Sequence, residues 1–155
     1  MNTPEKIEGI PTARKCNKER VELITMYFGN LWKKLQKEGR RNCVFNEFLQ
    51  TDIYIKEHET DKKTTIPSSH DWKATYAIKH IEKVLKYAKN DDITKVYTPV
   101  KKTSKTQIKN GYKEEANLYY DFTSDKEYLN FRAYIRIGIK IDRKHILYCV
   151  SAVYV

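Results

Sequence analysis

The side chains in this sequence that could do chemistry are a histidine among lysines and tyrosines, and two arginines on an alternating segment. His80 suits proton transfer because the reference pKa of histidine is about 6.5. Arg132 and Arg136 suit phosphate because a planar guanidinium can donate two hydrogen bonds at once. Cleavage of RNA through its 2′-hydroxyl needs a base, an acid and cations around the phosphate. These residue types therefore point to metal-free chemistry on RNA.

Individual roles follow from the same chemistry. His80 is the candidate for base or acid, with His145 as the alternative. Tyr134 or Tyr154 can stack on a base or donate a hydrogen bond to the ligand. The competing interpretation of the two arginines is an exposed sheet face balanced by neighbouring acids. Four side chains make up the predicted catalytic set: His80, Arg132, Arg136 and Ser151.

The charge of the chain favours a polyanionic partner. The formal net charge is +10, which suits nucleic acid, an anionic membrane surface or an acidic protein. Residues 72–113 hold eleven lysines and only three acids, so polyanion binding should centre there and on the strand that carries Arg132. The side chains predicted to bind nucleic acid are Lys73, Tyr76, Lys83, Lys101, Lys102, Lys105, Tyr134 and Lys140.

No metal or other cofactor is predicted. The four histidines show no paired ligand spacing, and no acidic cluster suits magnesium. The glycines are scattered, so they form no phosphate-binding loop. Cys16, Cys43 and Cys149 are far apart and lack a redox or zinc spacing, which indicates reduced thiols in a cytoplasmic protein.

One segment must position the two arginines. From Leu129 to Ile141 every odd position is apolar and every even position is not. This period of two is typical of a strand with one face against a core. The other face would carry Arg132, Tyr134 and Arg136, so the sequence predicts a basic and aromatic surface on a rigid support.

Two segments have the apolar spacing of helices. Apolar residues recur every three or four positions from Glu19 to Glu38, which predicts a helix that ends near Gly39. The segment from Trp72 to Lys89 has a broader apolar stripe and is predicted to be a single helix. His80 falls on the flank of that stripe, among lysines and tyrosines.

The other elements complete an α+β prediction. We expect a short helix followed by a strand within 43–55, a loop at 57–69, strands at 93–100 and 116–122, and a basic loop at 101–111. The last run, 145–155, is apolar at nearly every position and should be a central strand covered on both faces. The predicted fold packs N-terminal helices on one face of a mainly antiparallel sheet of about four strands.

The chain of 155 residues is predicted to form a single domain, with residues 1–18 as a flexible arm. No apolar run approaches the length of a membrane span, so neither export nor integral membrane insertion is expected. We therefore expect a cytoplasmic protein.

Residues 72–155 resemble a ribonuclease superfamily. The resemblance rests on Lys79-His80-Ile81 with Val84-Leu85 behind it, a lysine-rich gap, and the final Ser151-Ala152-Val153-Tyr154. This order is similar to the barnase, EndoU, colicin and RelE-type ribonucleases, as found in phage proteins and polymorphic toxins. The resemblance implies helices before a four-stranded antiparallel sheet, and metal-independent RNA cleavage with His80, Arg132 or Arg136, and Ser151 at the matching positions. No obvious glutamate accompanies His80, so the second proton-transfer group is unassigned.

Three functions fit these observations. The first is a metal-independent ribonuclease-like protein, phage-associated or toxin-like, that acts on RNA. The second is a nonenzymatic basic module that binds nucleic acid, RNA in preference to DNA. The third is a phage or effector protein-interaction domain that binds an acidic partner such as an inhibitor. Many lysines and few arginines favour binding by charge over precise recognition, which fits the second function.

Overall fold

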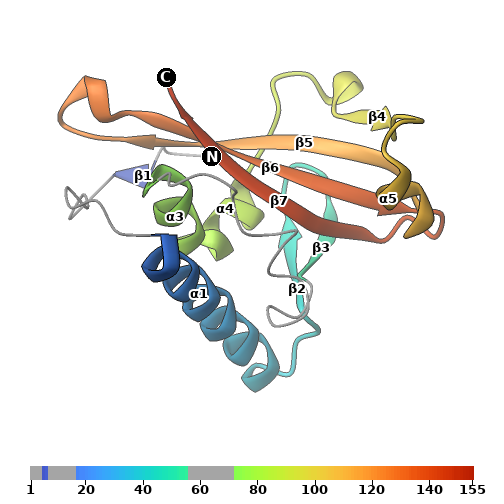
Figure 1. The fold of residues 1–155 in the computed structure, drawn as a ribbon, viewed down its shortest axis with the longest axis horizontal. Coiled ribbons are helices and arrows are strands. Elements are labelled where there is room, and N and C mark those ends of the chain that lie inside the picture. Colours follow the sequence, from blue (N-terminus) through green and yellow to red (C-terminus); the bar gives the residue numbers. More distant parts are fainter. Residues whose placement is uncertain (1–4, 7–16, 56–71) are drawn as a thin grey trace.

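The computed structural model describes residues 5–6, 17–55 and 72–155, which form an α+β fold (Figure 1). The helices are α1 (Asn17–Lys37), α3 (Trp72–Lys79), α4 (Ile81–Tyr87) and α5 (Lys105–Lys109), with 3₁₀ turns η1 (Ile93–Lys95) and η2 (Glu127–Leu129). The strands are β1 (Glu5–Lys6), β2 (Cys43–Asn46), β3 (Thr51–Ile55), β4 (Tyr97–Pro99), β5 (Tyr112–Thr123), β6 (Phe131–Lys140) and β7 (His145–Tyr154). The predicted fold class is confirmed at this level.

The strands form one mixed sheet of seven in the order β1-β5-β6-β7-β3-β2, with β4 also pairing β5. The three long strands β5, β6 and β7 are antiparallel neighbours, whereas β3 runs parallel to β7 and β1 parallel to β5. The expected sheet of about four strands was therefore too small. The strands that were not predicted are β1 and β2. β1 has only two residues and pairs with the distant β5, and β2 has four residues in a segment whose apolar spacing predicted a helix.

Strand β6 has the alternation that its sequence predicted. Phe131, Ile135 and Ile139 are buried on the side of the helices, while Tyr134 and Arg136 are exposed on the other side. Strand β7 lies inside the sheet, between β6 and β3, so the central position of the C-terminal strand is confirmed. Its second half is not covered on both faces, because Ser151, Val153 and Tyr154 are exposed. A bulge in β7 near Tyr148 shifts its register against β6.

The core lies between the sheet and three helices. Helix α3 packs on β6 and β7, α4 packs on β2 and β5, and α1 packs against α3 (Figure 1). Their apolar residues, such as Phe28, Ile78 and Leu85, share one cluster with Ile135 and Leu147 of the sheet. Helix α5 lies at the far end of the long strands, beside the start of β5 (Figure 1).

The predicted helix from Trp72 to Lys89 is broken into α3 and α4 at His80. His80 has φ −109° and ψ 29°, which is outside the helical region, and α4 begins at the next residue. The break redirects the chain, because α3 contacts β6 and β7 whereas α4 contacts β2 and β5. An apolar stripe continues across such a break, so the sequence pattern could not reveal it.

The short helix expected after Cys43 is wrong, because β2 and β3 form an antiparallel hairpin there. The amide of the fully buried Asn46 donates to the carbonyls of Leu85 and Ala88, at 2.7 and 3.0 Å, and its oxygen accepts the Leu49 N–H at 2.7 Å. These bonds close the turn and join it to the end of α4. The hairpin thus depends on a contact distant in sequence, which overrides the helical spacing of the local apolar residues.

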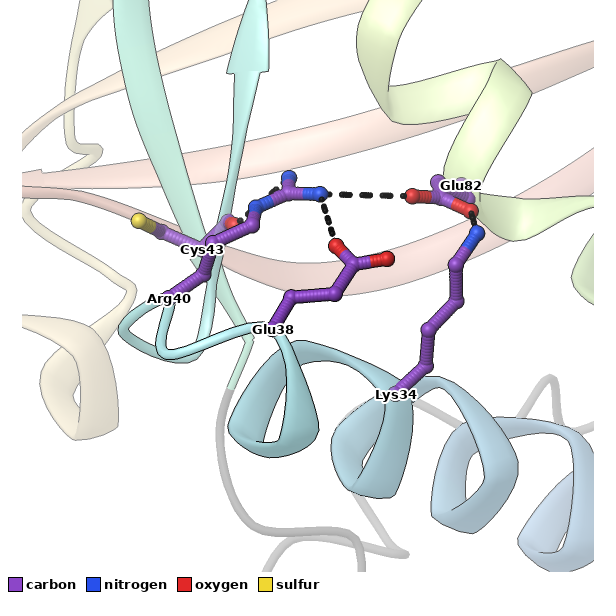
Figure 2. A network of polar contacts seen from close by, with 5 residues as sticks. All are labelled: Lys34, Glu38, Arg40, Cys43 and Glu82. Carbon is purple, nitrogen blue, oxygen red and sulfur yellow. Dashed lines mark hydrogen bonds and ion pairs between the residues drawn. The ribbon is translucent and has the colours of Figure 1, made fainter.

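Exposed ion pairs connect the end of α1 to α4 and β2. Figure 2 shows Lys34 and Arg40 on either side of Glu82, with Lys34 Nζ 2.6 Å and Arg40 3.6 Å from its carboxylate. Arg40 also pairs with Glu38 at 2.9 Å and donates to the carbonyl of Cys43 at 3.4 Å. The hydrogen bond from Lys34 to Glu82 raises the pKa of this lysine. Such exposed pairs each contribute little, about 0–1 kcal/mol, so they orient α1 more than they stabilise it.

Several smaller predictions also differ from the structure. The expected strand at 93–100 is η1 followed by the short β4, and the basic loop at 101–111 contains α5. The expected strand at 116–122 is longer, since β5 runs from Tyr112 to Thr123. The predicted loop at 57–69 lies outside the described residues. Most of the predicted arm does too, although within it Glu5–Lys6 pair with the end of β5.

Candidate functional site

One face of β5, β6 and β7 points away from α1, α3 and α4, and we call it the outer face. It carries the residues that alternate with the core-facing ones: Asn117, Tyr119, Asp121, Arg132, Tyr134, Arg136, Ser151 and Val153. Tyr119 is buried there by its neighbours. Tyr134 lies at its centre, paired across the sheet with Tyr119 on one side and Ser151 on the other. Its side chain is 37% exposed, so an aromatic ring is presented to solvent on a rigid strand.

Arg132 is held in place by its neighbours. Its guanidinium makes two hydrogen bonds to the carboxylate of Asp121, at 2.7 and 3.2 Å, and lies 3.9 Å from the centre of the Tyr119 ring. The bond to Asp121 raises the pKa of Arg132 further above its usual value. Since the carboxylate offsets its charge, Arg132 supports the aromatic surface more than it attracts a phosphate.

Tyr119 connects the outer face to the segment after α4. Its hydroxyl donates to Asp91 at 2.5 Å, and this bond, with a smaller contribution from burial, raises the pKa of Tyr119 to about 12. The Tyr119 and Tyr134 rings meet edge to face, with centroids 6.4 Å apart. This geometry is favourable for aromatic pairs, so Tyr119 orients the exposed ring of Tyr134.

His80 lies on the opposite side of the sheet from the other predicted catalytic residues. Its ring packs between those of Tyr76 and Phe122, with centroid distances of 4.8 and 6.2 Å. Phe122 faces the core, whereas Arg132 and Arg136 face outwards. Groups that act on one phosphate must all lie within hydrogen-bonding distance of it. The structure does not bring His80 together with the arginines or with Ser151 in this way, because they lie on opposite sides of the sheet.

The residues predicted to bind nucleic acid divide into three groups. Lys73, Tyr76 and Lys83 belong to the helical side. Tyr76 is buried in the core, and Lys73 Nζ lies 4.0 Å from the centre of the Tyr154 ring. Tyr134 and Lys140 lie on β6, with Lys140 Nζ 5.5 Å from the centre of the Tyr112 ring. The exposed residues Lys101, Lys102 and Lys105 surround the start of α5.

The end of the sheet next to α5 is strongly basic. Residues 93–113 contain six lysines and no acid, and the turn between β6 and β7 adds further cations beside them. We call this region the basic end, made up of Lys101, Lys102, Lys105, Lys109, Lys113, Lys140, Arg143 and Lys144. It adjoins the outer face, because β5 begins and β6 ends there.

His145, the alternative candidate for proton transfer, has a structural position. It is only 4% exposed; its Nδ1–H donates to the Arg143 carbonyl at 2.7 Å, and its Nε2 accepts from the Tyr97 hydroxyl at 2.9 Å. Both ring nitrogens are therefore occupied, and the ring joins β4 to the start of β7. No sequence signal could reveal this, since the two strands are not neighbours in the sheet.

Burial, aided by the nearby charge of Arg143, lowers the pKa of His145. The unfolded chain therefore takes up a proton first as the pH falls through about 6.5, and stability decreases by up to about 1.4 kcal/mol per pH unit below that value. Urea unfolding at pH 7, 6 and 5 should show a shallower loss for His145→Asn than for the wild type. The two proteins would instead lose stability in parallel if His145 became protonated equally easily in both states. The other histidines are common to both proteins, so their contributions cancel.

Two features are absent from the described residues. No helix there is long and apolar enough to cross a membrane. No group of three or more histidine, cysteine, aspartate or glutamate side chains in that part of the chain is placed to hold a metal ion.

Comparison with known proteins returned no relative. No protein-family model, curated protein or solved structure matches the chain. The ribonuclease resemblance therefore stays a prediction.

Proposed function

We propose that this protein binds single-stranded nucleic acid, RNA in preference to DNA, on the outer face of its sheet without cleaving it. The observation that carries the proposal is the exposed ring of Tyr134 on the outer face, oriented by Tyr119 and followed along β6 by the exposed Arg136. An aromatic ring on a rigid surface can stack on any base, and such stacking contributes about 1–3 kcal/mol per base.

The basic end supplies the charge that this mode of binding needs. Its lysines flank the outer face. An RNA strand whose base stacks on Tyr134 would continue towards these lysines and place its phosphates beside them. Lysine-rich contacts bind the backbone without reading sequence, and they make the affinity depend strongly on salt. Binding should therefore tolerate many sequences and weaken steeply as salt is added.

The position of His80 favours binding over catalysis. The ribonuclease hypothesis needs His80 and an arginine at one phosphate, but the sheet lies between them. On the binding hypothesis, RNA incubated with the protein and EDTA stays intact while it is bound. The third hypothesis, an acidic protein partner, needs only the basic end and gives no role to Tyr134.

A binding titration tests the proposal. The anisotropy of a labelled single-stranded RNA of about 12 nucleotides would be measured with the wild type, Tyr134→Ala and Tyr128→Ala. Loss of stacking at Tyr134 should raise Kd about tenfold, which corresponds to about 1.4 kcal/mol. Tyr128 is a matched control, because it is 72% exposed but lies in η2, outside the outer face.

Two results would contradict the proposal. One is the absence of RNA binding at low salt by folded protein, which would favour the acidic-protein hypothesis. The other is an equal change in Kd for both tyrosine variants, which would mean that Tyr134 has no special position. RNA cleavage in EDTA that is lost in His80→Ala would restore the ribonuclease hypothesis.

A further inference from the structure

An open pocket of about 420 Å³ lies where β3 meets the turn between β6 and β7. Asp52 and Tyr54 contribute from β3, and Arg143 and Lys144 from the turn. In β3 the core residues are Ile53 and Ile55, so the alternating Asp52 and Tyr54 are on the side of the sheet away from the helices. The pocket therefore belongs to the outer side of the sheet, at the basic end. Its volume is in the range of sites for small ligands.

The pocket is joined to the outer face by a second apolar cluster. Tyr112, Ile146 and Tyr148 form this cluster around Gly138, and Tyr54 packs against it. Gly138 follows Arg136 by two positions on the same side of β6. This buried cluster therefore lies between Arg136 and Tyr54, and an RNA strand that stacks on Tyr134 and passes Arg136 would cross it to reach Tyr54.

The lining combines cations, an aromatic ring and carboxylates. Arg41 and Lys144 provide positive charge, and Lys144 Nζ lies 4.3 Å from the centre of the Tyr54 ring. Asp52 is an exposed acceptor. Asp142 accepts the backbone N–H of Lys144 at 3.0 Å and so closes the turn. A simple anion would contact only the cations. A nucleotide would contact all three kinds of group: its phosphate would pair with the cations, its base would stack on the ring, and its hydroxyl or amino groups would donate to Asp52.

The turn between β6 and β7, which carries Asp142 and Lys144, is held in one conformation before any ligand binds. Arg143 has a φ of +68°, a left-handed conformation that favours glycine, and it is retained here by specific contacts. Its carbonyl accepts from the buried His145, and its guanidinium donates to Glu114 at 2.5 Å. A second bond, from Lys140 N to Lys144 O at 3.1 Å, closes the hairpin. A site that is rigid before binding loses less free energy to ordering.

We propose that this pocket binds the terminal, phosphate-bearing nucleotide of a single strand, with its phosphomonoester at Arg41 and Lys144 and its base at Tyr54. The inference rests on the proposed function, because the strand reaches the pocket from the outer face. A terminal phosphomonoester carries up to two negative charges, whereas each internal phosphodiester carries one. The cations of the pocket therefore attract a phosphorylated RNA terminus more strongly than an internal phosphodiester.

The test compares RNAs of one sequence that carry a 5′-phosphate, a 3′-phosphate or hydroxyls at both ends. The wild type should bind one phosphorylated form about tenfold more tightly than the unphosphorylated form. Arg41→Ala and Lys144→Ala should each remove this preference, so that the phosphorylated and unphosphorylated RNAs bind the variant with equal affinity. Lys126→Ala is the matched control, since this exposed lysine lies at the opposite end of β5 and β6. Tyr134→Ala should weaken all three RNAs equally and keep the preference.

The outcomes separate the two proposals. Equal affinity for the three RNAs, with normal sensitivity to Tyr134→Ala, would overturn the pocket and keep the proposed function. If no RNA binds, the proposed function fails, and calorimetry with nucleoside monophosphates then tests the pocket alone. Binding of a monophosphate that is lost in Lys144→Ala would support the pocket, whereas no heat of binding would overturn it. Inorganic phosphate binding as tightly as the nucleotide would overturn the roles of Tyr54 and Asp52.

Discussion

Replacing Gly138 by valine is expected to destabilise the protein by about 3 kcal/mol or more. This is the largest effect expected for a substitution on the outer side of β6. Gly138 has an ordinary strand conformation, so backbone freedom is not the reason. The space above it is occupied by two aromatic rings: a Cβ there would lie 2.5 Å from Tyr112 Cδ1 and even closer to Tyr148. These rings are themselves buried and meet edge to face, with centroids 5.4 Å apart. They cannot move apart without breaking the second apolar cluster.

Equilibrium unfolding in urea measures this effect. Arg136→Val is the matched control, because it places the same β-branched side chain two positions earlier on the same side of β6, where the residue is exposed. The double variant Gly138→Ala, Tyr148→Ala should lose less stability than the sum of the two single changes, since Tyr148→Ala removes one of the two rings that the new methyl group meets. Full stability of Gly138→Val would show that the Tyr112 and Tyr148 rings do not lie over Gly138 as they do in the structure.

Replacing Asn46 by alanine is expected to cost about 2–4 kcal/mol. The side chain is fully buried and makes three hydrogen bonds to backbone groups, of Leu85, Ala88 and Leu49. Its loss leaves these groups without their partner in the protein interior, and each unsatisfied buried group costs about 1–3 kcal/mol. The hairpin of β2 and β3 and the end of α4 should loosen together, because one side chain connects them.

Asn46→Asp makes this prediction sharper. The carboxylate can still accept from the Leu49 N–H, but it places a buried negative charge against two carbonyl oxygens, so it should destabilise the protein more than alanine does. Asn110→Ala, at the exposed end of α5, is the control and should change stability by less than about 0.5 kcal/mol. Thermal unfolding of the four proteins would give the order. If aspartate were tolerated better than alanine, the two donated bonds would not be the ones that matter.

The sequence by itself determined the features that depend on neighbours along the chain. The period of two in Leu129–Ile141 predicted both faces of β6, and the spacing in Glu19–Glu38 predicted α1. The accumulation of lysines between 72 and 113 indicated a basic surface, part of which is the basic end. These patterns are local, because the burial of one strand or helix face is repeated every two or every three to four residues.

Only the tertiary structure decided which of these features lie together. Whether His80 and Arg132 share a site depends on the side of the sheet from which each points, and α3 and α4 lie on the side opposite to Arg132. The hairpin after Cys43 depends on Asn46 reaching the end of α4, some forty residues later in the chain. The pocket near Tyr54 exists because β3 runs parallel to β7. Each is a contact between distant segments, which is set by packing in three dimensions and leaves no periodic trace in the sequence.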